Sequence, residues 1–163
     1  MNLIYIGKIT STHGIKGELK IKSNFEYKDK VFVIGNKLII DNKEYIIKSH
    51  RVHKGFDMVT LNDYKDINEV LFLLNKKVYI SKKNDSISDI ILDEDLKDFD
   101  AVINGEKGVI REVFFASSVN KIIRVLINGK EVLVPFNKEF IKNIDKNKKE
   151  VNIELIDGMM LWK

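Results

Sequence analysis

The stretch GKITSTHGIKGELKI, residues 7–21, decides the fold of the N-terminal half. Apolar and polar residues alternate on both sides of a short segment that contains Gly14 and Gly17. Alternation with a period of two is typical of a strand with one buried face, and glycine accepts the positive φ that a tight turn requires. The stretch therefore predicts two strands joined by a turn, with Lys16 exposed at its tip.

The same glycines raise two alternatives that involve phosphate binding. A P-loop requires the spacing G-x-x-x-x-G-K-[ST], and no glycine stands at the required distance before Gly7-Lys8. Gly14-Ile15-Lys16-Gly17 has the G-x-x-G spacing of the loop that clamps a nucleic-acid backbone in KH domains. That loop joins two helices, whereas strands flank it here, so the strand-turn-strand interpretation is favoured.

Short runs rich in β-branched and aromatic residues continue through the rest of the first half. Asp41-Asn42 and Lys54-Gly55 each fit a two-residue hairpin loop. One amphipathic helix is predicted at 66–74, with Asp66 and Glu69 as a capping box and Asn75 as a left-handed stop. Strands at this spacing favour a small barrel, which we expect this helix to plug. The predicted strands are 3–9, 19–23, 37–40, 45–52, 56–61 and 77–81.

The second half repeats the strand rhythm after a polar segment that carries seven carboxylates between positions 85 and 100. We predict a first barrel over 1–83, an acidic linker over 84–94 and a second barrel over 95–163. Asn128-Gly129 predicts a hairpin between two strands. The predicted elements are strands at 101–103, 108–115, 121–127, 131–134 and 150–156, and a short helical turn at 140–144. The predicted fold class is mainly all-β, with two small β-barrels.

Composition excludes several classes of protein. The chain of 163 residues is 44% apolar and has no cysteine, so it can form no disulfide and no thiolate metal site. Its longest apolar run is 70–74, too short to span a bilayer, and the N-terminus lacks the apolar run of a signal peptide. We therefore expect a cytoplasmic protein with no membrane association.

Charge is distributed unevenly between the two halves. Residues 1–84 hold 16 Lys/Arg and 9 Asp/Glu, whereas residues 85–163 hold 12 and 15. Such asymmetry can mark one half that faces nucleic acid and another that faces protein. Two solvated surfaces of different composition explain the same numbers, so both interpretations stay open.

The histidines do not predict a metal site or a catalytic site. A metal needs three or four convergent ligands, and His50 and His53 would face opposite sides of one strand. His13 lacks a carboxylate in its own segment with which it could act as a general base. We therefore expect no metal, no cofactor and no enzymatic activity. Phe136, after Val134-Pro135, is expected in the core of the second barrel.

Taken together, these segments resemble the RimM family of bacterial ribosome maturation factors. Residues 7–21 are similar to its N-terminal signature, in which a Gly-Lys strand leads into Thr-His-Gly, two residues, Gly-Glu and a second strand. His53-Lys54-Gly55, with 58–61, is similar to a second signature. In the second half, 105–110 and 129–136 resemble the PRC barrel of that family.

Three short segments depart from the family pattern. Ile91-Leu92 stands where members often carry two tyrosines, and Lys97-Asp98 replaces Ile-Gly. Ser117-Ser118-Val119-Asn120 replaces a Gly-Ala-Asn-Asp loop. These departures concern contacts of the linker and leave the domain assignment intact.

The resemblance implies a translation-factor-like six-stranded N-terminal barrel with one short helix, and a C-terminal PRC barrel. It implies a non-enzymatic, monomeric assembly factor that binds the immature small ribosomal subunit near its head. The implied partners are the nineteenth small-subunit protein, contacted largely through the C-terminal half, and small-subunit rRNA. The candidate contacts to RNA or the ribosome are Lys8, His13, Lys16, Lys20, Lys22, His53 and Lys54. The candidate contacts to the ribosomal protein are Ile91, Leu92, Asp93, Asp95 and Phe136.

Two other functions stay open at this point. A general RNA-binding or translation-factor-like barrel would act on free RNA, and its binding would depend steeply on salt. A small metabolic enzyme would need a convergent acid, base and nucleophile, which the sequence does not offer.

Overall fold

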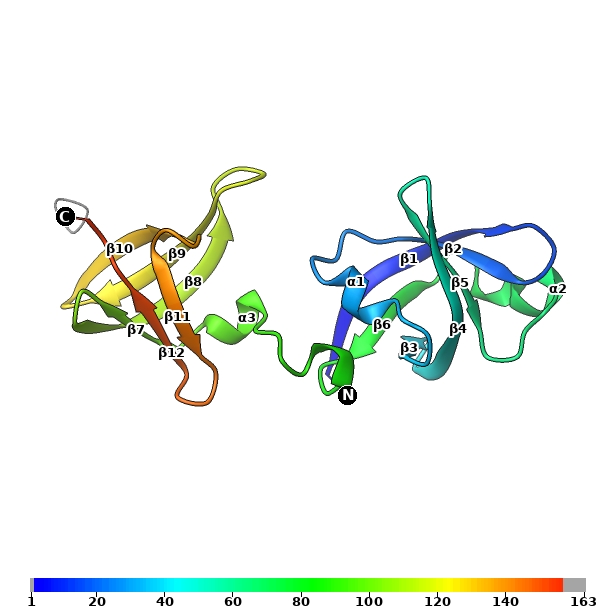
Figure 1. Cartoon of the computed structure of the whole chain (residues 1–163), viewed down its shortest axis with the longest axis horizontal. Helices are drawn as coiled ribbons and strands as arrows, with labels where there is room; N and C mark the ends of the chain where they lie inside the picture. The colour runs from blue at the N-terminus through cyan, green and yellow to red at the C-terminus, as the bar shows by residue number, and fades with distance from the viewer. Residues whose placement is uncertain (1, 157–163) are drawn as a thin grey trace. The chain divides into compact units, whose positions relative to one another are not determined.

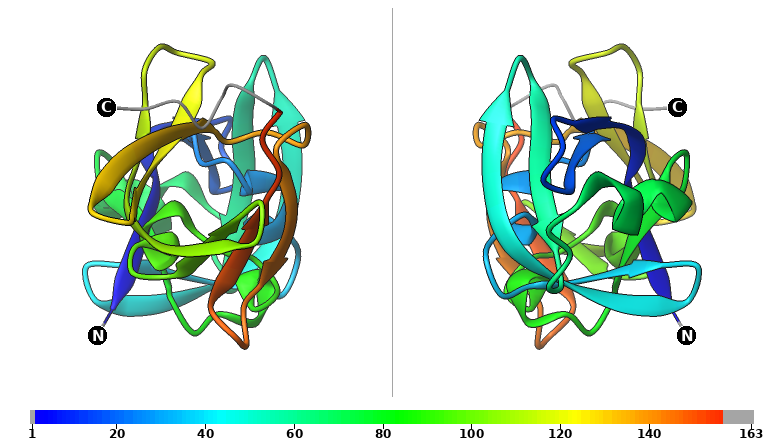
Figure 2. Two further views of the ribbon diagram at one scale, coloured as in Figure 1. Left: turned by 90° about the vertical axis from the view of Figure 1, so that its left-hand side faces the viewer. Right: turned by 90° about the vertical axis from the view of Figure 1, so that its right-hand side faces the viewer.

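In the computed structural model, which describes residues 2–156, the chain forms two compact units, Met1–Ile90 and Ile91–Lys163. Both units are built mainly of strands (Figure 1). Figure 2 gives two further views of the same ribbon. Among the residues described, no helix is long and apolar enough to cross a membrane.

The first unit is a closed barrel with the strand order β1-β2-β5-β4-β3-β6. Closure pairs every strand edge, which leaves no edge free to pair with another chain. Alternate side chains such as Leu19 and Ile21 on one strand and Val59 on the next are fully buried inside it. The strands are β1 Leu3–His13, β2 Glu18–Lys22, β3 Lys37–Ile40, β4 Lys43–His53, β5 Phe56–Leu61 and β6 Lys77–Ser81.

Two-residue hairpin turns form where the sequence predicts them. Asp41 and Asn42 have φ values of 51° and 62°, and Lys54 and Gly55 have 50° and 82°. Two consecutive positive φ values are the signature of the turn that matches the twist of paired strands. The loop 14–17 is a wider turn, with positive φ at both glycines. The predicted turns are confirmed.

β1 and β4 run further than the predicted strands. Each is interrupted by bulges, at Thr10 in β1 and at Lys48 in β4, where the register of pairing shifts by one residue. A bulge bends a strand and strengthens its twist. Long strands can therefore wrap around the barrel, and β1 continues to His13.

The predicted helix at 66–74 is shorter than expected. α2 covers Ile67–Val70, and a 3₁₀ turn covers Leu71–Leu73. Asp66 accepts the N–H of Asn68, so the predicted cap is present. Because a 3₁₀ turn has about three residues per turn, the buried stripe moves from Leu71 to Leu73, and Leu71 and Phe72 are exposed. A second short helix, α1 Lys28–Val31, is absent from the sequence-based prediction.

The second unit is a six-stranded sheet with the order β10-β9-β8-β7-β12-β11. Its buried side chains, among them Ile110, Val125 and Val134, make one hydrophobic core. A hairpin at Asn128-Gly129 joins β9 and β10, as predicted. The strands are β7 Asp100–Ile103, β8 Glu106–Phe115, β9 Lys121–Ile127, β10 Lys130–Pro135, β11 Ile141–Asp145 and β12 Glu150–Ile153.

The prediction of a helical turn at 140–144 is wrong. This segment is the strand β11, which pairs with β12 so that Ile144 lies opposite Val151. Pairing with the next strand, across a four-residue turn, outweighs the weak local preference of this segment. β12 ends at Ile153, before the predicted 156, and the side chain of Asn104 then holds Leu155 through two hydrogen bonds. Residues 157–163 of the predicted second domain lie outside the described residues.

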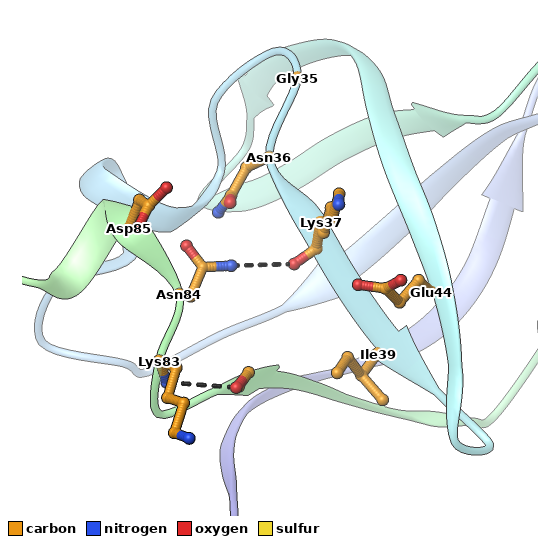
Figure 3. Close-up of a pocket in the computed structure, with 9 residues that line it drawn as sticks. Gly35, Asn36, Lys37, Ile39, Glu44, Lys83, Asn84 and Asp85 are labelled. Atoms are coloured by element: carbon orange, nitrogen blue, oxygen red, sulfur yellow. Dashed lines mark hydrogen bonds between the residues drawn. The ribbon is translucent and has the colours of Figure 1, made fainter. Parts of the chain in front are cut away.

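The segment predicted as an acidic linker, 84–94, is ordered. Residues 84–90 lie on the first unit, where Ile87 and Ile90 are buried. Figure 3 shows the side-chain amide of Asn84 donating to the carbonyl of Lys37, at 3.3 Å. The end of the segment begins α3, Asp93–Leu96, which belongs to the second unit.

Candidate nucleic-acid interface

Three exposed lysines form a row across adjacent strands of the first barrel. Lys8 on β1 lies directly opposite Lys22 on β2 and directly opposite Lys77 on β6. Like charges placed opposite one another destabilise a sheet. Such a row is expected where a polyanion binds. Lys8 and Lys22 were predicted from the sequence, whereas Lys77 was not, because only closure of the barrel brings β6 beside β1.

A second group of predicted residues meets on the outer face of the same barrel. The rings of His13, at the end of β1, and His53, at the end of β4, contact each other with centroids 5.5 Å apart. The Lys20 ammonium lies 4.0 Å from the centroid of the Phe56 ring, a cation–π contact. Residues 40 positions apart in the sequence therefore form one cluster, which we call the histidine cluster: His13, Glu18, Lys20, Arg51, His53 and Phe56.

Glu18 is the one carboxylate of the histidine cluster, and it forms a salt bridge with Arg51. The Arg51 guanidinium donates two hydrogen bonds to Glu18, at 2.9 and 2.7 Å. These bonds hold the pKa of Glu18 below its ordinary value, against the opposing effect of burial. Because Glu18 is engaged in this way, it leaves the surrounding positive charge largely uncompensated.

The pKa of His53 is lowered, first by partial burial and then by the neighbouring cations Arg51 and Lys54. His13 and Lys20 add to the same effect. An anion bound among these groups would offset the repulsion. The histidine cluster is therefore suited to hold a phosphate group.

We expect substitution of Glu18 by glutamine to lower the free energy of unfolding by at most about 1 kcal/mol at pH 7, because Arg51 is half exposed and water screens the pair. Since the pKa of Glu18 is lowered in the fold, the stabilisation is present above the ordinary pKa of 4.5 and is lost as the pH falls through the lowered value. Urea unfolding at pH 7 and at about pH 3 measures this. An equal difference at both pH values would contradict the assignment.

His50 is separate from this group. Its Nε2 lies 2.8 Å from Oδ1 of the buried Asp57, and its ring stacks on Phe32. The register places His50 opposite Val59 and His53 opposite Phe56, so the two rings lie on different faces. Within residues 2–156, no three histidine or carboxylate side chains converge as metal ligands.

The remaining predicted RNA contacts, Lys16 and Lys54, are exposed in the loops that end two hairpins of the barrel. All seven candidates thus lie on the first unit. Their side chains form two sites on it, the lysine row and the histidine cluster, with the two loop lysines beside the latter.

In the second unit, the structure brings Asp93 and Phe136 together. Both contact Lys121, whose ammonium lies 2.8 Å from Asp93 Oδ1 and 5.0 Å from the centre of the Phe136 ring. The exposed ring of Phe115 lies 5.6 Å from the same ammonium. Neither Phe115 nor Lys121 was predicted from the sequence as a member of this site. We call these four residues the Lys121 cluster.

The other candidates near the linker have mainly structural surroundings. Ile91 packs against the core of the second unit, and Leu92 is half-buried. Asp95 accepts the N–H of Leu92 at 3.0 Å and so caps α3.

Neighbouring carboxylates are also paired, Asp89 with Lys30, Asp98 with Arg111 and Asp100 with Lys107. The acidic segment is therefore partly neutralised within each unit, and less free negative charge remains to attract a basic partner.

Comparison with known proteins agrees with this architecture. Residues 4–85 match the RimM N-terminal domain family, and residues 93–159 match the RimM PRC barrel domain family. The ribosome maturation factor RimM of Staphylococcus aureus is 32% identical over 96% of this chain and 98% of its own length. That of Oceanobacillus iheyensis is 33% identical over 95% of each. A crystal structure of a 16S ribosomal RNA processing protein RimM from Pseudomonas aeruginosa covers 95% of this chain and 98% of its own, with a TM-score of 0.48 and 21% identity.

Two strand-rich domains, the first bearing rows of exposed lysines, define a class of β-barrel proteins with a surface suited to polyanions. The sequence matches are more specific, and the chain belongs to the RimM family of ribosome maturation factors. This is a family of assembly factors and not of enzymes, and it is associated with the ribosome. The predicted family and the predicted all-β fold are confirmed.

Proposed function

We propose that this protein assists maturation of the small ribosomal subunit by binding its immature form near the head. The family supports a role in ribosome assembly. The observation that carries the proposal further is the row of Lys8, Lys22 and Lys77, because three like charges held opposite one another favour a polyanionic partner such as rRNA.

The two units would then have different partners. The first unit would lie on rRNA through the lysine row and the histidine cluster. The second unit would contact the nineteenth small-subunit protein through the Lys121 cluster, flanked by Ile91 and Leu92. Phe115 supports this assignment, because an exposed aromatic ring beside a partly buried cation is the kind of anchor that protein interfaces use.

Capture of the full chain from a bacterial lysate tests the main proposal. A tagged chain should recover free immature small subunits, identified by their protein content and by unprocessed rRNA ends. Recovery of mature ribosomes alone, or of free RNA without subunits, would contradict it. The second of these outcomes would instead favour a general RNA-binding function.

The proposed protein contact is tested with the purified nineteenth protein. Replacing Phe115 by serine should weaken binding by about tenfold without unfolding the second unit, because 59% of the Phe115 side chain is exposed. Leu133→Ser is the matched control, since Leu133 is 56% exposed on β10, outside the Lys121 cluster. Calorimetric titration measures the affinity. Equal losses for both variants would argue against a contact at Phe115.

A further inference from the structure

Two open hollows on the first barrel join to make one trough. The first is lined by residues of the β1–β2 loop, including His13 and Lys16, together with Glu18 and Thr60. The second shares Lys16 and Thr60 with the first and continues toward α2. Its remaining lining residues are Lys48, Asn62, Asp63, Tyr64 and Lys65. The trough therefore runs from the histidine cluster to the segment that precedes α2.

The trough carries an excess of positive charge, and the backbone directs that charge into it. Lys48 is the extra residue of the bulge in β4, because Ile47 pairs with Leu61 and Ser49 pairs with Thr60. A bulge re-aims the side chain that it inserts. With Lys16 and Lys65, the lining holds three lysines against two carboxylates, Asp63 and Glu18, and Arg51 already pairs with Glu18.

A hydrogen bond and a close backbone contact fix the wall of the trough against the start of α2. The carbonyl of Ile15 accepts the N–H of Ile67, which fixes the β1–β2 loop against the start of α2 (Figures 1 and 2). Gly17 has φ +87° and lies so close to Asp66 that an added Cβ would contact its backbone at 3.4 Å. Lys16 is thus held at the wall of the trough.

Aromatic rings stand at the α2 end of the trough. Tyr64 lines it, and the Phe72 ring meets the Tyr64 ring at 85° with centroids 6.2 Å apart. Despite this contact, Phe72 is 53% exposed. Lysines that follow a backbone, together with an aromatic ring at one end, are the combination that binds unpaired nucleotides.

We propose that this trough binds a single-stranded segment of RNA, with phosphates on Lys16, Lys48 and Lys65 and a base stacked on Tyr64 or Phe72. This proposal rests on the proposed function and specifies the RNA that the first unit takes. A duplex does not fit, because its bases are already stacked on one another and offer no free face to an aromatic ring. An acidic peptide would use the lysines but would gain little from the rings.

Fluorescence anisotropy with the full chain tests the proposal. The probes are a labelled uridine oligonucleotide of about ten nucleotides and an RNA duplex of the same length. The oligonucleotide should bind more tightly than the duplex. Replacing Tyr64 by leucine should weaken oligonucleotide binding by about 5- to 150-fold, the range found when a stacking ring is removed.

Tyr5→Leu is the matched control for the ring. Tyr5 is 52% exposed and makes the same edge-to-face contact, with Tyr79, away from the trough. The Tyr5→Leu variant should bind the oligonucleotide as the parent chain does. Phe72→Leu gives a second variant whose exposed ring is not needed for folding, in case Tyr64→Leu lowers stability.

Salt dependence tests the lysines. Lys48→Gln should reduce the slope of log affinity against log salt by about 0.7 between about 50 and 200 mM salt, the value for one phosphate contact to a single strand. Lys43→Gln, an exposed lysine at the start of β4 outside the trough, should leave the slope unchanged. Thermal unfolding of each variant shows that the fold is kept.

Three results would overturn the trough proposal: no binding of the oligonucleotide, equal binding of the duplex, or Tyr64, Phe72 and Lys48 variants that bind as the parent does. Capture of immature subunits separates this proposal from the proposed function. If the parent chain recovers immature subunits but the trough variants bind the oligonucleotide as the parent does, only the trough proposal is refuted. Specific oligonucleotide binding without recovery of subunits would refute the proposed function alone.

Discussion

Replacing Gly108 by valine is expected to destabilise the second unit strongly while the first unit keeps its stability. Gly108 lies on β8 where this strand crosses close to β9. A Cβ at this position would stand 2.6 Å from the carbonyl oxygen of Leu126 and 2.8 Å from Cβ of Ile127. Neither atom is the end of a flexible side chain, so β9 itself would have to move.

The expected cost is about 3 kcal/mol, at the upper end of overpacked cores, because backbone must shift as well as side chains. At about 0.05–0.15 kcal/mol per residue, a unit of this size has about 4–11 kcal/mol of stability in total. The valine variant should therefore lose a large part of this stability and hold the second unit only in part at 37 °C. It should also lose binding to the nineteenth protein, if the proposed contact is correct.

Hydrogen exchange measured by mass spectrometry resolves the two units in one chain. Peptides from 91–156 should lose protection in Gly108→Val, and peptides from 2–90 should keep it. Gly129→Asn is the control, because Gly129 has open space around it and asparagine tolerates its φ of +75°. Full protection of 91–156 in the valine variant would show that the close approach of β8 and β9 does not limit the stability of the second unit.

Replacing Asp57 by alanine is expected to lower the free energy of unfolding of the first unit by about 2–3 kcal/mol. Asp57 is 2% exposed, with Oδ1 at 2.8 Å from His50 Nε2 and Oδ2 at 3.7 Å from Lys28 Nζ. Removing the carboxylate leaves the half-buried His50 without its partner. The loss stays below the value for a fully buried pair, because Lys28 can reach water.

Asp29→Ala is the matched control, an exposed carboxylate on α1 beside Lys28, and should change stability by less than about 0.5 kcal/mol. Urea unfolding followed by circular dichroism measures both variants. Asp57→Asn should cost less than Asp57→Ala, because the amide keeps an atom within hydrogen-bond distance of His50. If Asp57→Ala and Asp29→Ala changed the free energy of unfolding equally, the buried contact would contribute nothing to stability.

The main features of each unit could be predicted because their signals are local. Strands with alternating residues, such as β2 and β9, and turns such as Asn128-Gly129 occur where expected. Errors arose where pairing with another strand, and not the preference of the segment itself, decided the outcome. Residues 140–144 have a weak local preference and become a strand only through pairing with β12.

The candidate sites were predicted residue by residue, but their grouping was not. His13 and His53 were named as separate contacts, and the structure places their rings together. Lys77, Lys48 and Tyr64 gave no signal in the sequence, because an exposed lysine or tyrosine on a strand or loop is common. Lys77 could have been found from the sequence only if the pairing of β6 with β1 had been known.

The elements, the turns that separate them and the family to which the chain belongs could all be predicted from sequence patterns. Each of these patterns depends on residues within a few positions of one another. The surfaces of the molecule, in contrast, follow from the three-dimensional fold. Neighbours across a sheet are set by register, bulges and barrel closure, which join segments dozens of residues apart. The loop of Gly14 and Gly17, a simple turn in the sequence, becomes the wall of a trough because it docks on α2.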